Sequence, residues 1–80
     1  MSKNLLKKYE DVFIKSFSIE KKKLKNLKYN DIPEWDSVGH MTMIANLEEE
    51  FSITFEMDDI IDFSSFKTGI SILKKYKINI

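Results

Sequence analysis

Apolar residues recur every three or four positions at the start of the chain, as they do along one face of a helix. The stripe in residues 2–17 consists of Leu5, Leu6, Tyr9, Val12, Phe13 and Phe17. This spacing matches the 3.6-residue period of an α-helix with one side turned to a core. We therefore predict a helix from Ser2 to Phe17, with Ser2 as its N-cap.

A second helix is predicted after the turn-forming segment Asn30–Pro33. Asp36 is a good N-cap, so this helix should begin at Asp36–Ser37 and end near Phe51. Its core-facing sector contains Met43, Ile44, Leu47 and Phe51, with His40 on the same side.

The second helix also has a narrower apolar stripe on its opposite side. The stripe consists of Val38, Met41 and Ala45, and it is flanked by Thr42, Glu48 and Glu49. An apolar strip with acidic neighbours on a small domain favours docking of a partner. The alternative is that the preceding long loop folds over the strip.

The C-terminal part predicts one short and one longer helix. One turn is expected at Asp58–Ile61, followed by a helix from Ser65 to Tyr76 with Ser64 as its cap. Its inward-facing residues are Phe66, Ile70, Leu73 and Tyr76, with Ile72 beside them. Gly69 costs this helix about 1 kcal/mol relative to alanine. A glycine inside a helix usually has a packing reason, so we predict close packing at that point. Residues 52–55 alternate like a strand, but they have no evident partner strand.

Residues 18–36 have no clear period. They contain the basic segment Lys21–Lys28 and scattered apolar anchors at Ile19, Leu24, Leu27, Tyr29, Ile32 and Trp35. This stretch is either a long loop or a loop that hides a short helix near residues 20–28. Two glycines and one proline favour helices over a many-stranded β fold. The predicted fold is all-α: one domain over residues 1–80, an antiparallel bundle of three long helices and one short helix, with a long first connection.

Composition excludes several kinds of chemistry. The chain has no cysteine, which rules out disulfides, thiolate metal ligands and a protein thiol nucleophile. A single histidine argues against a histidine-rich metal site. The apolar runs are too short for a membrane span, and the N-terminus lacks the apolar core of a signal peptide. We therefore expect a cytoplasmic protein without membrane insertion.

The zero net charge conceals an uneven distribution. Residues 1–40 carry nine lysines against six acidic residues, and residues 41–80 carry four lysines against seven. No lysine or arginine occurs between Tyr29 and Phe66, where ten acidic residues lie. This region predicts either a negative field that steers a basic partner or a solvated surface that maintains solubility.

Ser37 is the residue whose position suggests chemistry. It follows an Asp cap in the first turn of the second helix, where backbone N–H groups have no partner within the helix. These donors and the positive end of the helix dipole favour a phosphate group. By itself, Asp-Ser-Val is a weak signal, because Asp and Ser commonly start helices.

The wider context makes the signal specific. Segment Trp35–Met41 (WDSVGHM) leads without a gap into Leu47–Phe51 (LEEEF). This resembles the acyl carrier protein family, in which an Asp-Ser-Leu motif opens the second helix and an acidic segment ends it. The resemblance covers nearly the whole chain, with later apolar positions in register at Phe55, Ile60, Phe63, Phe66, Ile70 and Leu73.

The resemblance implies a carrier without catalytic activity of its own. Ser37 matches the serine that receives 4′-phosphopantetheine from coenzyme A, and Asp36 matches the Asp that helps to place the metal ion during that transfer. The positions that meet partner enzymes correspond to Val38, Met41, Ala45, Glu48 and Glu49. Acyl or aminoacyl intermediates would be held as thioesters on the arm, which explains why the protein needs no cysteine.

The implied partners are a phosphopantetheinyl transferase, a ligase that loads the cargo, and downstream synthases or transferases. The carrier is expected to be a monomer with no metal site of its own. Val38 replaces the more usual Leu, Gly39 and Thr42 stand where acidic residues are frequent, and the first loop is unusually basic. These departures favour a specialised pathway, such as secondary metabolite or surface polysaccharide synthesis. The alternative is a carrier of housekeeping fatty acid biosynthesis.

Two other classes of function compete with the carrier assignment. Ser37 and His40 are three residues apart on a helix and could form a nucleophile–base pair, but no third orienting group or nucleophile elbow is evident. The Lys21–Lys28 segment could bind nucleic acid as part of a helical bundle. The chain has no arginine and no recognition helix that would read bases, so a solvated basic loop is the better interpretation.

Overall fold

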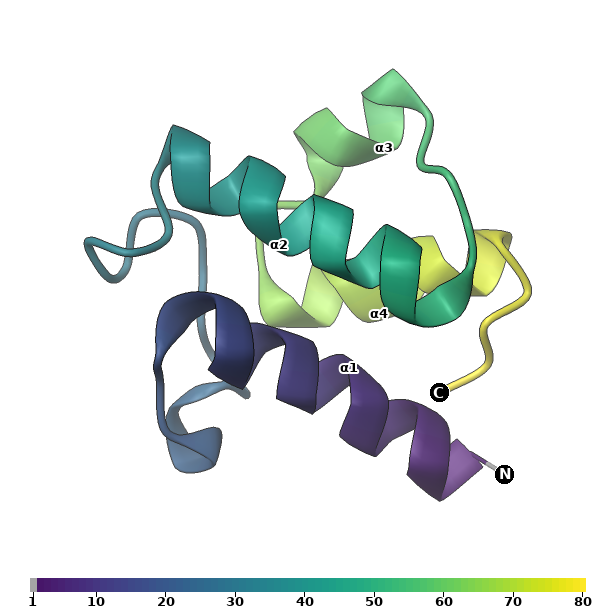
Figure 1. The fold of residues 1–80 in the computed structure, drawn as a ribbon, viewed down its shortest axis with the longest axis horizontal. Coiled ribbons are helices and arrows are strands. Elements are labelled where there is room, and N and C mark those ends of the chain that lie inside the picture. Colours follow the sequence, from purple (N-terminus) through teal and green to yellow (C-terminus); the bar gives the residue numbers. More distant parts are fainter. Residues whose placement is uncertain (1) are drawn as a thin grey trace.

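The computed structural model describes the backbone of residues 2–80 and the side chains of residues 5–80, and within this range the chain is all-helical. It contains four α-helices, α1 (Ser2–Phe17), α2 (Ser37–Phe51), α3 (Met57–Asp62) and α4 (Phe66–Lys75), and one turn of 3-10 helix, η1 (Lys21–Lys23) (Figure 1). Residues 2–80 contain no strand, and Lys28 and Ser65 form an isolated antiparallel bridge. None of these helices combines the length and apolar character needed to cross a lipid bilayer.

The predicted bounds of the first two helices are confirmed. Asp36 caps α2 as expected, since its side chain accepts a hydrogen bond from the backbone N–H of Gly39. The side chain of Ser2 lies outside the part of the chain that the structure describes, and so does its predicted role as an N-cap. The single turn predicted at Asp58–Ile61 is the six-residue helix α3.

The predicted start of the last helix is wrong by one residue. Ser65, not Ser64, is the N-cap of α4, and its Oγ accepts a hydrogen bond from the backbone N–H of Thr68. The carbonyl of Ser64 instead accepts a hydrogen bond from the backbone N–H of Tyr29 at 2.9 Å. Pairing with the first connection thus keeps Ser64 outside the helix. At the other end, the helix finishes at Lys75, with Tyr76 as its C-cap.

An aromatic cluster around Phe13 joins the helices. α2 runs back along α1 in the opposite direction, and the two helices pack together (Figure 1). The fully buried ring of Phe13 lies 5.1 to 6.2 Å, centroid to centroid, from five other aromatic rings. These rings belong to Tyr9, Phe17, Trp35, Phe63 and Phe66. One side chain therefore connects α1 with the connection before α2, with the loop between α3 and α4, and with the start of α4.

Close packing at Gly69 is confirmed. A Cβ atom at this position would collide with the hydroxyl of Tyr9 and the ring of Phe63. The hydroxyl of Tyr9 donates a hydrogen bond to the carbonyl of Phe66 at 2.6 Å, which fastens α1 to the first turn of α4. Burial raises the pKa of Tyr9, so this hydroxyl keeps its proton and remains a donor.

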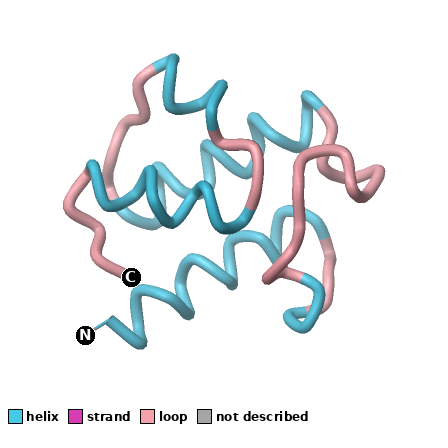
Figure 2. Tube along the Cα trace, turned by 180° about the vertical axis from the view of Figure 1, so that it is seen from behind, coloured by secondary structure: helices cyan, strands magenta, loops and turns pink. Residues whose placement is uncertain are grey.

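The first connection is anchored by buried side chains, although it contains no α-helix. Leu24, Leu27 and Trp35 are almost completely buried. Figure 2 shows this connection as a long loop interrupted by η1. Of the two alternatives for this stretch, the structure thus has the loop with a short helical turn within residues 20–28. Tyr29 differs from the other anchors because it is 37% exposed. Leu6, predicted on the inward stripe of α1, is also exposed, since it lies at the edge of the core.

A buried carboxylate holds α3 against the end of α4. Asp59 is 3% exposed, and it accepts hydrogen bonds from the amino group of Lys75 and the hydroxyl of Tyr76, both at 2.6 Å. These two bonds hold the pKa of Asp59 below its ordinary value. The backbone N–H of Glu56 donates to the Tyr76 hydroxyl at 2.9 Å, so the residue that precedes α3 is also connected to the end of α4.

Candidate functional site

Ser37 lies exposed at the first position of α2. Asp36 organises this end of the helix through two acceptors. Its side-chain Oδ1 accepts from the backbone N–H of Gly39 at 2.8 Å, and its carbonyl accepts from the backbone N–H of His40 at 2.7 Å. The Ser37 hydroxyl is therefore presented to solvent from a fixed helical turn, as the sequence predicted.

Gly39 has a steric role that the sequence did not reveal. A Cβ atom on Gly39 would collide with the carbonyl oxygen of Glu34. The segment before Asp36 therefore passes directly over the first turn of α2, and only glycine permits this approach. An acidic side chain at this position would push the loop away from Ser37. The close approach of the Glu34 carbonyl therefore requires glycine at position 39.

Tyr29 reaches the Ser37 hydroxyl from the first connection. The two hydroxyl oxygens are 3.1 Å apart, and either one can donate the hydrogen bond. The Tyr29 ring packs edge-on against Trp35 and His40, at centroid distances of 6.3 and 5.7 Å. The sequence suggested Tyr29 only as an apolar anchor, because it lies in a loop eight positions before Ser37 and no local period connects the two residues.

His40 is partly buried, as predicted, and both of its ring nitrogens are engaged. The indole N–H of Trp35 donates to Nδ1 at 2.9 Å, and Nε2 lies 2.8 Å from the carbonyl oxygen of Ile60. Nδ1 accepts, so the proton of the neutral ring is on Nε2, which donates to Ile60. His40 thereby ties the loop before Ser37 to α3. Neither nitrogen is free to take a proton from the Ser37 hydroxyl.

An apolar groove of about 380 Å³ begins at Ser37 and continues between α2 and α3. Its lining consists of Tyr29, Ser37, His40, Met41, Met57, Ile60, Ile61, Phe63 and Ser64. Most of these residues expose carbon to the groove, while the hydroxyls of Tyr29 and Ser37 lie at one end. Such a concave, mostly apolar site with a few polar groups is typical of a small-molecule site.

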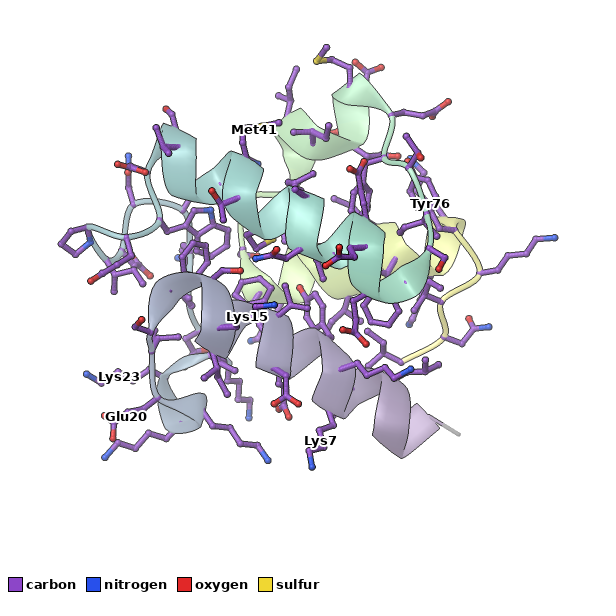
Figure 3. All side chains as sticks on the ribbon, in the orientation of Figure 1. Lys7, Lys15, Glu20, Lys23, Met41 and Tyr76 are labelled. Atoms are coloured by element: carbon purple, nitrogen blue, oxygen red, sulfur yellow. The ribbon has the colours of Figure 1, made fainter. Side chains whose placement is uncertain are left out.

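The predicted apolar stripe of α2 is exposed and continues onto α3. Val38 is 75% exposed and Met41 is 51% exposed, and Figure 3 places Met41 between α2 and α3. Ala45 is also exposed. The sequence did not identify Met57 and Ile61, which are 71% and 70% exposed and lie across the groove. Their position depends on how α3 docks, which no local pattern reveals.

The two glutamates predicted for the partner surface differ. Glu49 is exposed, whereas Glu48 is half-buried and its Oε2 accepts a hydrogen bond from the backbone N–H of Phe55 at 2.9 Å. Glu48 therefore fastens the connection between α2 and α3, in addition to any role at the surface. Thr42 donates from Oγ1 to the carbonyl of Val38, which satisfies its hydroxyl within the helix.

Among residues 5–80, no three His, Asp or Glu side chains are grouped so that they could hold a metal ion. The candidate site combines the exposed hydroxyl of Ser37, the capped start of α2 and an adjoining apolar groove. No protein-family model matches the chain, and no curated protein matches it.

Proposed function

We propose that the chain is a carrier protein that holds acyl or aminoacyl intermediates as thioesters on a 4′-phosphopantetheine arm attached to Ser37. The observation that carries this proposal is the exposed hydroxyl of Ser37, fixed in the capped first turn of α2 at the mouth of an apolar groove. A separate transferase can reach such a hydroxyl without any rearrangement of the fold. The resemblance in segments Trp35–Met41 and Leu47–Phe51 supports the same assignment.

The residues around Ser37 fit a phosphodiester-linked arm. Free N–H groups at the start of α2 and the helix dipole stabilise a phosphate at this position. The Tyr29 hydroxyl, 3.1 Å from Ser37 Oγ, supplies a further donor beside it. Asp36, which the resemblance assigns to placing the metal ion during transfer, precedes Ser37 directly. When bound, the arm supplies the thiol that carries the cargo, a group that the cysteine-free chain lacks.

The arrangement of the helices supports a carrier fold. α1, α2 and α4 have 16, 15 and 10 residues, and the six-residue α3 precedes α4. We infer an antiparallel bundle of these three longer helices, with the first connection as the long loop expected of an acyl-carrier-like domain. The groove beside Ser37 provides apolar surface on which the arm or an apolar cargo can lie.

The pathway is proposed from the departures at Gly39, Thr42 and the lysines of the first connection. These changes reduce the negative charge at the start of α2 and favour a specialised biosynthetic pathway over housekeeping fatty acid synthesis. The proposed carrier is a cytoplasmic monomer. It acts by presenting cargo to other enzymes through Val38, Met41, Ala45, Glu48 and Glu49, and it does not catalyse a reaction. The bonds made by His40 to Trp35 and Ile60 support this assignment over a Ser37–His40 dyad.

The proposal is tested by intact-protein mass spectrometry. The chain is incubated with coenzyme A, magnesium and a broadly tolerant phosphopantetheinyl transferase. The mass should rise by one phosphopantetheine unit, and Ser37→Ala should abolish the increase. Ser18→Ala, which removes another exposed serine, should leave the increase unchanged. An unmodified wild-type protein beside a fully modified reference carrier would refute the proposal.

A further inference from the structure

A large hollow bordered by lysines lies apart from the Ser37 groove and shares none of its lining residues. In Figure 1, η1 lies below α1, whereas α3 lies above α2. Figure 3 shows Lys23 and Glu20 projecting from the η1 side, away from Met41. The hollow measures about 660 Å³, compared with about 380 Å³ for the groove beside Ser37. The carrier function proposed above does not use this side of the molecule.

The interior of the hollow is apolar and recessed. Leu6 from α1, Leu24 from the first connection, and Phe66 and Ile70 from α4 line it. Leu24 and Phe66 are only 1% and 6% exposed, so they form a floor below the surrounding surface. Leu6, at 36% exposure, contributes the most accessible carbon. A recessed apolar floor can receive a bulky side chain from another molecule.

The border of the hollow is positively charged. Lys21, Lys22 and Lys25 line it, and Lys25 also lines an adjoining cleft of about 420 Å³ that contains Lys28 and Lys67. The carboxylate of Glu10, which borders the hollow, lies 3.7 Å from the amino group of Lys21. Among the side chains of residues 5–80, no carboxylate lies within 4 Å of the amino groups of the other four lysines. The border therefore has positive charge available for a partner.

We propose that this lysine-bordered hollow is a second docking surface, which binds an acidic segment of a partner protein through one bulky apolar side chain flanked by carboxylates. The charge requires an anionic partner. The recessed floor favours a protein side chain over a membrane, because membrane-bound surfaces bury apolar side chains that protrude. It also favours a protein over a single-stranded nucleic acid, which would need exposed aromatic rings for stacking, whereas Phe66 is buried.

The two surfaces could then be occupied at the same time. Residues of α2 and α3 line much of the groove, whereas residues of α1, α4 and the segment that contains η1 line the hollow. α3 and η1 lie at opposite ends of the view in Figure 1. An acidic partner would have little attraction for the α2–α3 side, since no lysine occurs between Tyr29 and Phe66. The hollow thus gives the protein a means of staying near one partner while Ser37 faces another.

The test is a titration of the full-length, 15N-labelled protein with a short synthetic peptide that carries one tryptophan between glutamates and aspartates. Chemical-shift changes should centre on Leu6, Leu24, Lys25 and Ile70 and should spare Ser37 and Met41. Lys25→Glu should weaken binding about tenfold, whereas Lys15→Glu, the same charge change on another exposed lysine, should weaken it less than about twofold. Replacing the peptide's tryptophan with glycine should also cost about tenfold.

Several results would overturn the proposal. These are the absence of binding at the highest soluble peptide concentration, equal binding of the glycine peptide, and equal effects of the two lysine substitutions. Preferential binding of phosphatidylglycerol vesicles or of single-stranded DNA at the same residues would also overturn it, since the occupant would then be a membrane or a nucleic acid. The titration does not depend on the modification of Ser37, so its failure is separate from failure of the carrier assignment.

Discussion

The two sides of this small protein expose apolar carbon in opposite ways. On the α2–α3 side, Val38, Met41, Met57 and Ile61 protrude, each at least half exposed. On the η1 side, Leu24 and Phe66 lie at the bottom of a hollow that is bordered by lysines of residues 21–25. Protruding carbon suits broad contact with an enzyme surface, whereas a recessed floor selects a single inserted side chain. Apolar residues on the two sides can therefore support two different kinds of recognition.

Charge separates the two sides as clearly as shape does. Lysines gather in the first connection, and acidic residues occupy the segment between Tyr29 and Phe66. The contrast indicates that different partners would be selected by the sign of their charge as well as by their apolar contacts. The aromatic core supports both sides, because Phe13 contacts both Trp35, near Ser37, and Phe66, in the hollow.

Removing this shared support should destabilise the protein more than any other change considered below. Phe13→Ala should lower the free energy of unfolding by about 3–5 kcal/mol, because it leaves a cavity among five aromatic neighbours. We expect modification of Ser37 and peptide binding at the hollow to decline together. Urea denaturation followed by circular dichroism measures the loss, and Lys15→Ala should stay within about 0.5 kcal/mol of wild type. Loss of one function with full retention of the other would show that the two sides are independent.

A smaller loss of stability is expected from weakening the attachment of α3, a helix that borders the Ser37 groove but not the hollow. Asp59→Asn should lower the free energy of unfolding by about 1–2 kcal/mol at neutral pH, since Lys75 and Tyr76 lose their charged acceptor. The matched control is Asp62→Asn, an exposed carboxylate in the same helix, which should have little effect.

The dependence on pH follows from the direction of the shift. The folded-state pKa of Asp59 lies below its ordinary value of 3.8, so its stabilising contribution is present above that value. It is lost as the pH falls through the folded-state pKa. The difference between wild type and Asp59→Asn should therefore be full at pH 6 and should disappear in acid. A difference that persists at the lowest pH would show that the carboxylate charge is not responsible.

One charge placed on each side distinguishes the roles of the two surfaces. Met41→Glu should leave the fold intact and reduce the kcat/KM of the phosphopantetheinyl transferase about tenfold, since it places a charge in the apolar stripe. Lys25→Glu, on the other side, should change the same value less than about twofold. Steady-state kinetics with each variant as substrate provide the measurement. If Met41→Glu unfolds the protein, or if Lys25→Glu has the larger effect, the assignment of the two surfaces is wrong.

The smallest expected effect concerns the hydroxyl beside Ser37. Tyr29→Phe removes one exposed hydrogen bond, so it should slow modification two- to threefold and change stability by less than about 0.5 kcal/mol. Tyr76→Phe removes a hydroxyl from the Asp59 cluster instead. This variant should show the reverse pattern, with lower stability and unchanged modification by the transferase. Equal rates for wild type and Tyr29→Phe would show that the Tyr29 hydroxyl does not position Ser37.

Local signals were sufficient for much of the fold. The bounds of α1 and α2 follow from apolar spacing and from the Asp36 cap, both of which operate within a few residues. The start of α4 did not follow, because two adjacent serines are equally good caps. The choice between them depends on the hydrogen bond from Tyr29 to Ser64, which joins distant parts of the chain.

The same division holds at the site. The position of Ser37 and the exposure of Val38 and Met41 could be predicted, since a cap and a helical period determine them. The contact of Tyr29 with Ser37 and the exposure of Met57 and Ile61 could not, because they depend on the docking of the first connection and of α3. The need for glycine at position 39 could not be predicted either, because it depends on the close approach of the Glu34 carbonyl.

The attachment of the arm to Ser37 is tested most directly by locating the modification within the chain. After treatment with coenzyme A and the transferase, the protein is digested and its peptides are fragmented in a mass spectrometer. We expect the added phosphopantetheine mass to lie on Ser37 alone. Finding that mass on another residue, such as Ser18, Ser52 or Ser64, would contradict it.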